Sequence, residues 1–369
     1  MLTIPCNLPV CSSLWRARGR GTRVWLDERK DAARPDKVKN MPDEIPEFEP
    51  HAWLRTGHLQ TMAGPFLRRK FALPPAEERL FRVDDETQLK GMCHWQPGKR
   101  LDAPVIVVVH GLEGSCDSKY AIGIADKAYQ RGFHAVRMNQ RNCGGTELLT
   151  PTLYNSGMSG DYRAILMELI EKGGFEQVFF AGYSMGGNLV TKMAGEFADS
   201  APKQLRGVAV VCPALNLSAC ADALEKRENY LYQRHFVKGL LARYRRKVEL
   251  FPKHYSKNGF GRVRTVREFD DKITAPAFGY KDAQEYYEAA GGKRVIGQVK
   301  VPVLMMTAQD DPFVPYDVFQ RARVSENPLV RFVAPKHGGH CGFISKWEGA
   351  ERFWAEERIA EFCQEQAMK

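Results

Sequence analysis

Short apolar runs alternate with segments of helical spacing along most of the chain. Four runs are too apolar for strands that face water on one side, and they span residues 104–110, 178–181, 207–212 and 301–307. Such β-branched, fully apolar runs are typical of interior strands in a parallel sheet. Because helical patterns separate them, we expect a doubly wound α/β sheet with helices on both faces.

The two edges of this sheet have patterns of their own. Residues 80–95 predict two strands joined by a polar turn at 84–87, which gives the sheet an antiparallel start. At the other end, residues 330–334 predict the last strand and 348–364 a closing helix. Between them we expect a helix near 120–131, a strand at 133–138 and a helix from about 159 to 172.

The strand at 178–181 runs into a Gly-x-Ser-x-Gly turn formed by Gly182, Ser184 and Gly186. A segment of helical spacing follows the turn. Strand, tight turn and helix in this order hold a serine hydroxyl at the carboxyl edge of a parallel sheet, and the flanking residues must lack a Cβ. We therefore predict that Ser184 is a nucleophile, against the alternative of an ordinary serine in a loop.

A second glycine loop, His110–Gly111, follows the strand at 104–110. In α/β hydrolases this loop supplies one backbone amide that binds the oxyanion, and the residue after the nucleophile supplies the other. The expected donors are the amides of Leu112 and Met185. The alternative is a plain glycine turn at the end of a strand.

An acid and a histidine follow late strands, in the chain order expected of such a site. After the strand at 301–307 we choose Asp311, with Asp310 as the alternative. After the last strand we choose His340, with His337 second. The imidazole can then face Ser184 with one nitrogen and the aspartate with the other.

We interpret the other notable polar residues as structural. His51 and His58 lie in an irregular segment that wraps the core, and Asp161 is expected to cap a helix or face its dipole. His337, His340 and Cys341 could ligate a metal, but no second ligand pair occurs elsewhere in the sequence. We expect neither a metal nor an organic cofactor.

The strand and helix rhythm stops between residues 214 and 294. An insertion at this point, after the strand that follows the nucleophile, forms a cap over the site. We expect four parts: a disordered basic tail or mis-annotated start at 1–40, the first part of the catalytic domain at 41–213, the cap at 214–294, and the second part of the domain at 295–369.

The net charge of +10 is concentrated in two places. Residues 1–40 hold nine basic and four acidic residues, and 214–272 hold fourteen and seven. The body is near neutral, which argues against a nucleic-acid-binding fold. On the cap, Arg243, Arg245, Arg246 and Lys247 are expected to form a solvated face, with contact to anionic lipid headgroups as the alternative.

Targeting signals are weak in this sequence. It contains no run of 18 apolar residues, and its first residues make a poor signal peptide because prolines interrupt the apolar part. The nine cysteines are scattered and never form a Cys-x-x-Cys pair. We therefore expect a cytoplasmic protein without disulfides.

Several motifs together resemble the YheT-like branch of the α/β-hydrolase superfamily, the group that includes the α/β-hydrolase-domain proteins one, two and three. They are PHAWLRTGHLQT (50–61), HGLEGSCDSKY (110–120), NQRNCGG (139–145), YNSG (154–157), GYSMGGN (182–188), FDDKITAPAFGYKDAQEYY (269–287), DDPF (310–313) and HGGHCGF (337–343). The resemblance covers about residues 47–362. Asn142 and Asn155 depart from the residues such proteins tend to have there, glycine and histidine, and neither touches the proposed triad.

The resemblance implies the α/β-hydrolase fold, a mostly parallel eight-stranded sheet with a helical cap, and a serine hydrolase acting on carboxylic esters, with relatives linked to acylglycerols and phospholipids. The expected substrate is a short-to-medium acyl ester or acyl lipid. A thioesterase or acyltransferase would use the same Ser184, Asp311 and His340. A catalytically idle fold that binds lipid or protein is the alternative from another class.

Overall fold

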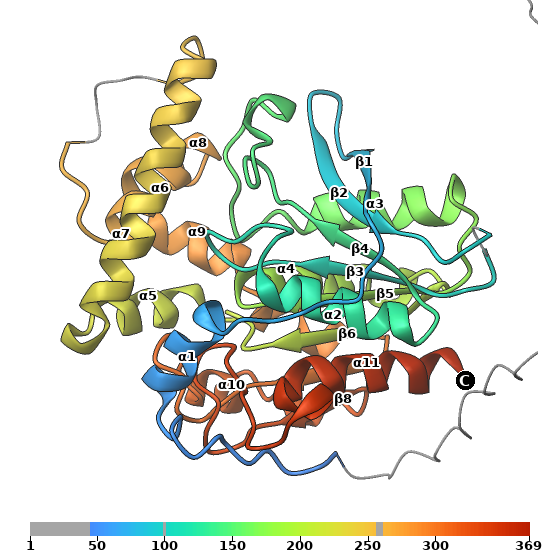
Figure 1. The fold of residues 1–369 in the computed structure, drawn as a ribbon. Helices are drawn as coiled ribbons and strands as arrows, with labels where there is room; N and C mark the ends of the chain where they lie inside the picture. Colours follow the sequence, from blue (N-terminus) through green and yellow to red (C-terminus); the bar gives the residue numbers. More distant parts are fainter. Residues whose placement is uncertain (1–44, 99–100, 256–260) are drawn as a thin grey trace, which may run out of the picture. The chain divides into compact units, whose positions relative to one another are not determined.

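The computed structural model describes residues 45–98, 101–255 and 261–369. The described residues form one compact unit built on an eight-stranded sheet (Figure 1). The predicted tail at 1–40 lies outside the described residues. No helix in the described ranges is long and apolar enough to cross a membrane.

The strands follow the order β1-β2-β4-β3-β5-β6-β7-β8 across the sheet. The pairs β1/β2 and β2/β4 are antiparallel and all the others are parallel. The predicted fold class is therefore confirmed. The strands are β1 Glu77–Arg82, β2 Gln88–His94, β3 Val105–Val109, β4 His134–Met138, β5 Val178–Tyr183, β6 Leu205–Val211, β7 Val303–Met306 and β8 Val330–Val333.

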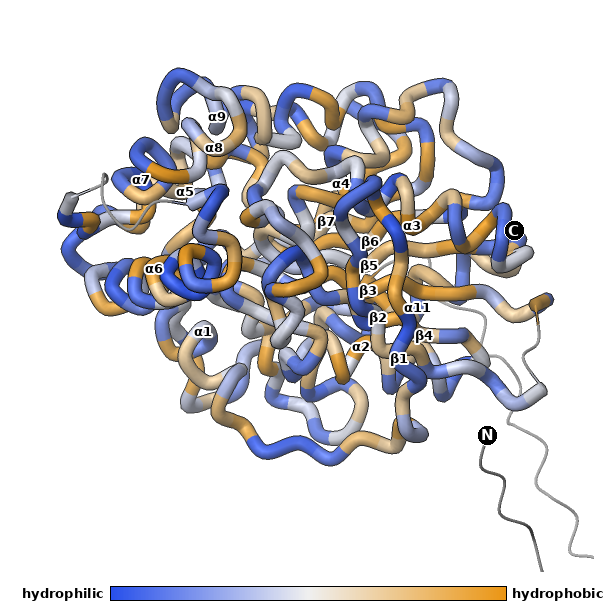
Figure 2. The backbone as a smooth tube through the Cα atoms, turned by 90° about the horizontal axis from the view of Figure 1, so that it is seen from above, coloured by the Kyte–Doolittle hydropathy of each residue, from blue (hydrophilic) through white to orange (hydrophobic). Residues whose placement is uncertain are grey.

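The central strands are buried on both faces, as their apolar sequences predict. In β3 every residue is buried, and the alternating side chains enter two separate cores. Val105, Val107 and Val109 belong to the core that includes residues of helices α3 and α4, whereas Ile106 and Val108 belong to the core with α2 and α11. Figure 2 shows these strands as a hydrophobic centre with more polar segments around it.

Helices cover both faces of the sheet and its carboxyl edge. The long ones are α2 Lys119–Gln130, α3 Ser159–Glu171, α4 Met185–Phe197 and α11 Trp354–Ala367 on the faces. Shorter ones are α1 Gly57–Phe66 and α10 Asp317–Arg321. The predicted closing helix begins at Trp354 rather than at residue 348, because Gly349–Arg352 forms a separate 3-10 turn.

The segment between β6 and β7 is helical (Figure 1). It contains α5 Leu217–Glu225, α6 Tyr230–Leu250, α7 Val266–Phe269, a π-helical turn at Asp270–Thr274, α8 Ala275–Ala277 and α9 Ala283–Ala290. These elements lie in the stretch 214–294 that the sequence assigns to a cap. The division of the chain into body and cap stays a prediction.

The expectation of one solvated basic face on α6 is wrong for two of its four residues. Arg243 forms an ion pair with Glu113 at 3.3 Å, with only 14% of its side chain exposed. Lys247 is fully buried and donates to the carbonyl oxygens of Glu147 and Thr150. Only Arg245 and Arg246 are exposed. The sequence pattern of α6 does not reveal the burial of Arg243 and Lys247, because long basic side chains can bury their stems and still reach polar partners.

Asp161 lies in the first turn of α3 as predicted, but it does not cap the helix. Its carboxylate accepts two hydrogen bonds from the Arg141 guanidinium, at 2.6 and 2.8 Å. Burial raises the pKa of Asp161, although Arg141 opposes this shift. The aspartate therefore ties the loop after β4 to α3.

Candidate active site

Ser184 occupies the turn between β5 and α4 with φ 52° and ψ −119°, a region that non-glycine residues rarely adopt. A Cβ at position 182 would lie 2.5 Å from the Gly186 carbonyl oxygen. One at position 186 would lie 2.4 Å from the carbonyl oxygens of Val109 and His110. Both glycines are thus sterically required. A strained backbone costs about 1–3 kcal/mol, and such strain clusters at functional sites.

Two aspartates in the loop after β7 bond to two histidines in the loop after β8. His340 Nδ1 lies 2.8 Å from Asp311 Oδ2, and the two side chains are 12% and 0% exposed. The other carboxylate oxygen of Asp311 accepts from the amides of Phe313 and Val314, at 2.8 and 3.0 Å. This inner pair is therefore buried and held in a fixed orientation.

The outer pair consists of Asp310 and His337. Their side chains are 3.2 Å apart and 23% and 45% exposed. Asp310 also accepts from the Gly339 amide at 2.9 Å, which places it as a support of the histidine loop. Neither residue lines the two cavities that contain Ser184.

The electrostatic environment of His340 favours its protonated form. Burial lowers the pKa of the imidazole, but the Asp311 carboxylate and the Cys341 sulfur raise it by more, so that it lies well above its ordinary value. A histidine with a carboxylate on one nitrogen is a stronger base at the other. His340 is also anchored through its amide, which donates to Thr61 Oγ1 at 2.8 Å.

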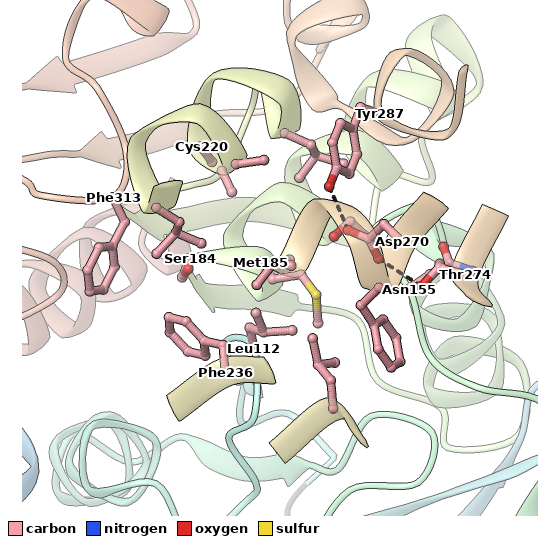
Figure 3. Close-up of a pocket in the computed structure, with 18 of the residues that line it drawn as sticks. Leu112, Asn155, Ser184, Met185, Cys220, Phe236, Asp270, Thr274, Tyr287 and Phe313 are labelled. Atoms are coloured by element: carbon pink, nitrogen blue, oxygen red, sulfur yellow. Dashed lines mark hydrogen bonds between the residues drawn. The ribbon is translucent and has the colours of Figure 1, made fainter. Parts of the chain in front are cut away.

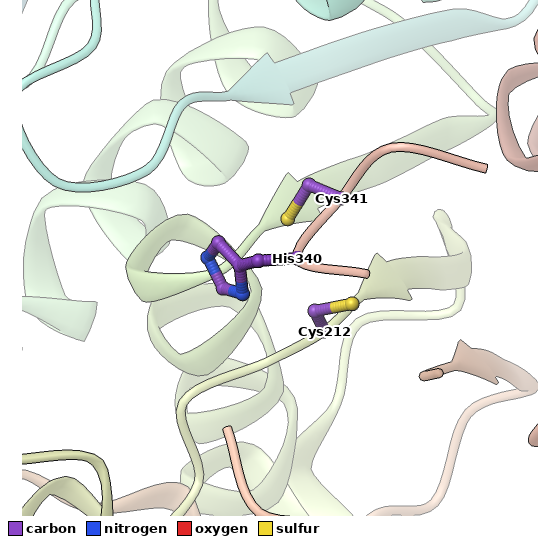
Figure 4. A group of neighbouring side chains, drawn as sticks. All are labelled: Cys212, His340 and Cys341. Carbon is purple, nitrogen blue, oxygen red and sulfur yellow. The ribbon is translucent and has the colours of Figure 1, made fainter. Parts of the chain in front are cut away.

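Two thiols accompany His340, and Figure 4 shows the group. One potential ligand atom from each of Cys212, His340 and Cys341 lies within 4.8 Å of the others. Burial raises the pKa of Cys341, but hydrogen bonding to Cys212 and the charge of His340 lower it, to about 6. Cys212, not His337, thus completes the set that the sequence raised as possible metal ligands. His340 already bonds Asp311, so we treat it as part of that pair.

The glycine loop after β3 is held by neutral groups. Burial lowers the pKa of His110 to about 4, so the ring is uncharged. Its Nδ1 donates to the Gly111 carbonyl oxygen at 2.8 Å, and its Nε2 accepts from the Gln140 amide at 3.1 Å. The Gly111 amide donates to Tyr120 Oη at 2.8 Å. These bonds fix the loop, and the amide of Leu112, the next residue, has no acceptor within the described residues.

Glu113 joins this loop to α6. It has a positive φ of 58°, and its carboxylate accepts from Tyr154 Oη at 2.7 Å and from Arg243 on α6 at 3.3 Å. Arg243 also donates to the Asn142 carbonyl oxygen and lies 5.1 Å from the centroid of the Tyr154 ring. One largely buried ion pair therefore connects α6 to the segment that carries Leu112.

A first cavity lies between the sheet edge and the helices that connect β6 to β7 (Figure 3). Ser184, Leu112, Met185 and His340 all line it. Most of the remaining lining is apolar, and includes Leu153, Leu217, Leu224, Phe236, Leu240, Val266, Phe269, Phe313 and Val314. Its volume of about 100 Å³ makes it a narrow slot.

Asp270 is one of several polar residues in this mostly apolar lining. Its carboxylate accepts from Thr274 Oγ1 at 2.7 Å and from Tyr287 Oη at 2.8 Å, as the dashed lines in Figure 3 mark. Burial raises the pKa of Asp270 to about 6. The two hydroxyls satisfy one lone pair on each oxygen, which ties the π-helical turn to α9.

A second cavity of about 440 Å³ also reaches Ser184 and His340. Its lining is more polar, with Arg69, Asp117, Lys119, Tyr120 and Glu356 among its residues. Arg69 and Glu356 form an ion pair within it, and Lys119 donates to the Leu67 carbonyl oxygen at 2.8 Å. The serine thus lies where an apolar and a polar cavity meet.

The structure brings together the residues that the sequence selects as a site. Ser184 and His340 line both cavities, and Asp311 lies behind the histidine. Within the described residues, Ser184 Oγ makes no hydrogen bond, and the amides of Leu112 and Met185 have no acceptor in the protein. His51 and His58 lie elsewhere: His51 Nδ1 accepts from the Trp53 amide, and His58 stacks on Tyr232.

Sequence reasoning missed Glu113 and Cys212. Glu113 follows the glycine loop directly, but its partners Tyr154 and Arg243 are 41 and 130 residues away. Cys212 directly follows the strand β6, where nothing in the local pattern distinguishes it from a buried apolar residue. Only the pairing of distant loops reveals either role.

Comparison with known proteins gives relatives of one kind. Residues 104–346 match the alpha/beta hydrolase fold family. The chain is 32% identical over 318 residues to the YheT esterase of Escherichia coli (strain K12), an alignment that covers 86% of this chain and 92% of that protein. It is 28% identical to the phospholipase ABHD3 of Mus musculus, with 80% of this chain and 73% of that protein covered. A monoacylglycerol lipase of Saccharomyces cerevisiae is also 28% identical, over 70% of this chain and 58% of that protein.

Solved structures agree on the fold. The esterase Est1E of Butyrivibrio proteoclasticus with bound ferulic acid superposes with a TM-score of 0.53 at 15% identity, covering 79% of this chain and all of that one. A 2,6-dihydroxy-pseudo-oxynicotine hydrolase gives the same TM-score at 17% identity, with 84% and 72% covered. At this level of identity the likeness concerns the backbone arrangement alone.

Proposed function

Since this chain belongs to the alpha/beta hydrolase fold family, on its YheT-like branch, and is thus an esterase- and lipase-like hydrolase, we propose that it cleaves carboxylic esters with a triad of Ser184, Asp311 and His340. The observation that carries the proposal is the buried Asp311–His340 pair, whose histidine shares both cavities with the strained Ser184. No step needs a group from outside the chain other than ester and water.

Each residue then has one task. His340, oriented by Asp311, takes the proton of Ser184 as its oxygen attacks the ester carbonyl carbon. The tetrahedral intermediate collapses to an acyl-enzyme when the C–O bond to the alcohol breaks, and His340 returns the proton to that alcohol. Water repeats the cycle on the acyl-enzyme and regenerates Ser184. Asp311 stabilises the imidazolium that forms in each half-reaction.

The oxyanion is bound by the amides of Leu112 and Met185. Met185 begins α4, so its amide is one of the free donors at a helix N-terminus. Both amides lack acceptors within the described residues, and both residues line the cavity with Ser184. One such donor is worth about 2.7–4 kcal/mol in the transition state. The His110 and Glu113 contacts keep the loop in place before substrate binds.

The two cavities suggest how the ester is divided. The apolar slot under the cap suits an acyl chain, and the larger polar cavity suits the alcohol part. The named activities of the relatives, an esterase, a phospholipase and a monoacylglycerol lipase, fit acyl-lipid or short-to-medium acyl esters. We propose this substrate class for the chain.

Hydrolysis kinetics test the proposal. Ser184→Ala should lower kcat on a p-nitrophenyl butyrate substrate by about a million-fold, the loss known for triads of this type. Ser200→Ala, the same change at an exposed serine next to the end of α4, should match the unsubstituted chain. Retention of more than a few per cent of activity by Ser184→Ala would refute the assignment.

A further inference from the structure

Exposed apolar side chains gather around α1. The largest exposures among such residues in the described ranges are Trp53 at 82%, Phe66 at 75% and Leu231 at 74%. Tyr230 is 60% exposed, and Leu59 and Met62 are about half exposed. We call these six residues the α1 patch. Single exposed apolar residues are normal, whereas a contiguous group marks an interaction surface.

The members of the α1 patch share one region for a structural reason. Leu59, Met62 and Phe66 recur at i, i+3 and i+7, which places them on one face of α1. The start of α6 meets α1 through His58 and Tyr232, whose rings stack at 5.7 Å and whose polar atoms lie 3.2 Å apart. Tyr230 and Leu231 directly precede this contact in sequence.

Exposed cations without a carboxylate partner among the described residues lie close in sequence to the members of the α1 patch. From residue 50 to 76 the sequence has no Asp or Glu. Arg55, Arg68 and Lys70 are exposed, and within the part of the chain that the structure describes no carboxylate lies within ion-pairing distance of them. On α6, Arg234 and Lys238 follow Leu231 at i+3 and i+7, also without a carboxylate partner there. Glu228 is the exposed acid nearest to the start of α6.

The other side of α1 borders the route to the serine. Thr61, Gly64 and Pro65 line the cavity of about 440 Å³ that contains Ser184 and His340. One short helix therefore has apolar side chains toward solvent and a wall of the candidate active site behind it. A surface that binds the patch would lie next to this cavity.

We propose that the α1 patch docks on an anionic lipid surface. Apolar side chains that include a tryptophan and are accompanied by Arg and Lys have the composition of interfacial anchors. In such anchors the apolar groups enter the headgroup boundary and the cations pair with lipid phosphates. The excess of cations argues for a negatively charged occupant. The step from docking to substrate entry rests on the proposed function, but docking itself does not.

Vesicle sedimentation tests the docking. The full chain should sediment with vesicles of phosphatidylcholine containing about one-third phosphatidylglycerol, and far less with phosphatidylcholine alone. Trp53→Ser combined with Phe66→Ser should weaken binding by at least about tenfold, because both apolar anchors are lost. Leu148→Ser, at a leucine 73% exposed outside the patch, is the matched control and should bind as the unsubstituted chain does.

A second pair of variants separates this surface from the basic residues of the cap. Arg68→Glu with Lys70→Glu should abolish the preference for anionic vesicles. Arg245→Glu with Arg246→Glu, at two exposed cations near the other end of α6 from Arg234 and Lys238, should leave binding within about twofold. The opposite result, with binding lost only in the α6 variant, would overturn the proposal.

Activity measurements distinguish a docking defect from a folding or catalytic defect. All these variants should hydrolyse a short soluble ester at the unsubstituted rate, and the patch variants should be slow only on a lipid ester embedded in anionic vesicles. Ser184→Ala should still bind vesicles, so that failure of the catalytic proposal can be distinguished from failure of the docking proposal. Equal vesicle binding by the unsubstituted chain and the Trp53/Phe66 variant would refute the docking. Absence of vesicle binding by the unsubstituted chain would also refute the docking. The occupant of the patch would then be a second copy of the chain, detected as a dimer in solution, or residues 1–44.

Discussion

Two aspartate–histidine pairs lie in the same two loops and differ in what surrounds them. Asp311 and His340 are buried, 2.8 Å apart, and the free oxygen of Asp311 is held by two amides. Asp310 and His337 are 3.2 Å apart and partly exposed, and they border neither cavity. The same two residue types thus form a buried pair whose histidine shares two cavities with Ser184 in one case, and a partly exposed loop support in the other.

The difference follows from geometry and solvation. An ion pair open to water gains about 0–1 kcal/mol, whereas a carboxylate removed from water must be satisfied by fixed donors. Asp311 has those donors in the Phe313 and Val314 amides. Burial and second bonds, more than residue type, distinguish the inner pair from the outer pair.

The largest expected contrast lies between the two histidines. His340→Gln should lower kcat/KM on a p-nitrophenyl ester by about a hundred-thousand-fold or more, because the general base and acid is lost. His337→Gln, the same change three residues earlier, should cost less than about threefold. Steady-state kinetics on both variants measure this, and comparable losses would mean that the two pairs are not functionally distinct.

The aspartates should show the next largest contrast. Asp311→Asn should lower kcat by about ten-thousand-fold, since the amide cannot stabilise the imidazolium that forms during the reaction. Asp310→Asn serves as the matched control and should retain most of the activity. If the Asp310 variant were the inactive one, the assignment of the third triad residue would have to move by one position.

The pH dependence should separate the same variants more finely. His340 must be neutral to act as a base, so activity is lost as pH falls through its pKa. Asp311 raises this pKa well above the ordinary value, which places the acid limb of the kcat/KM profile at higher pH than for a free histidine. In Asp311→Asn the raising charge is gone while burial still lowers the pKa, so the limb should move to lower pH. A limb that stays in place would show that another group titrates.

The smallest effect is expected on stability. Asp310→Ala removes a hydrogen bond from the Gly339 amide and should lower the free energy of unfolding by about 1 kcal/mol. Urea denaturation followed by circular dichroism measures the change. Asp317→Ala, at a half-exposed carboxylate of α10 that pairs only with Arg321 among the described residues, is the control for losing a surface carboxylate. A loss of several kcal/mol would give the outer pair a larger structural role than its exposure allows.

Local patterns predicted most of the architecture. Fully apolar runs such as 104–110 identify buried parallel strands, and the Gly182–Gly186 turn fits only a strand followed by a helix. The resemblance to YheT-like proteins is confirmed by the relatives. The choice of Ser184, Asp311 and His340 as a triad stays a prediction that the geometry favours.

Contacts between distant segments could not be predicted in the same way. The burial of Arg243 and Lys247 depends on Glu113 and on carbonyl oxygens at 147 and 150, about a hundred residues or more away in sequence. The approach of Cys212 to Cys341 depends on how the loop after β8 returns to the end of β6. Hydrophobic periodicity indicates which side of a helix is polar, but it does not indicate which polar groups that side contacts.

Covalent labelling with a fluorophosphonate probe, followed by mass spectrometry of the peptides, tests the central claim most directly. The account predicts one adduct per chain, on Ser184, formed much more slowly in His340→Gln and at the unsubstituted rate in His337→Gln. An adduct on another residue, or an unlabelled Ser184 in the folded chain, would contradict it.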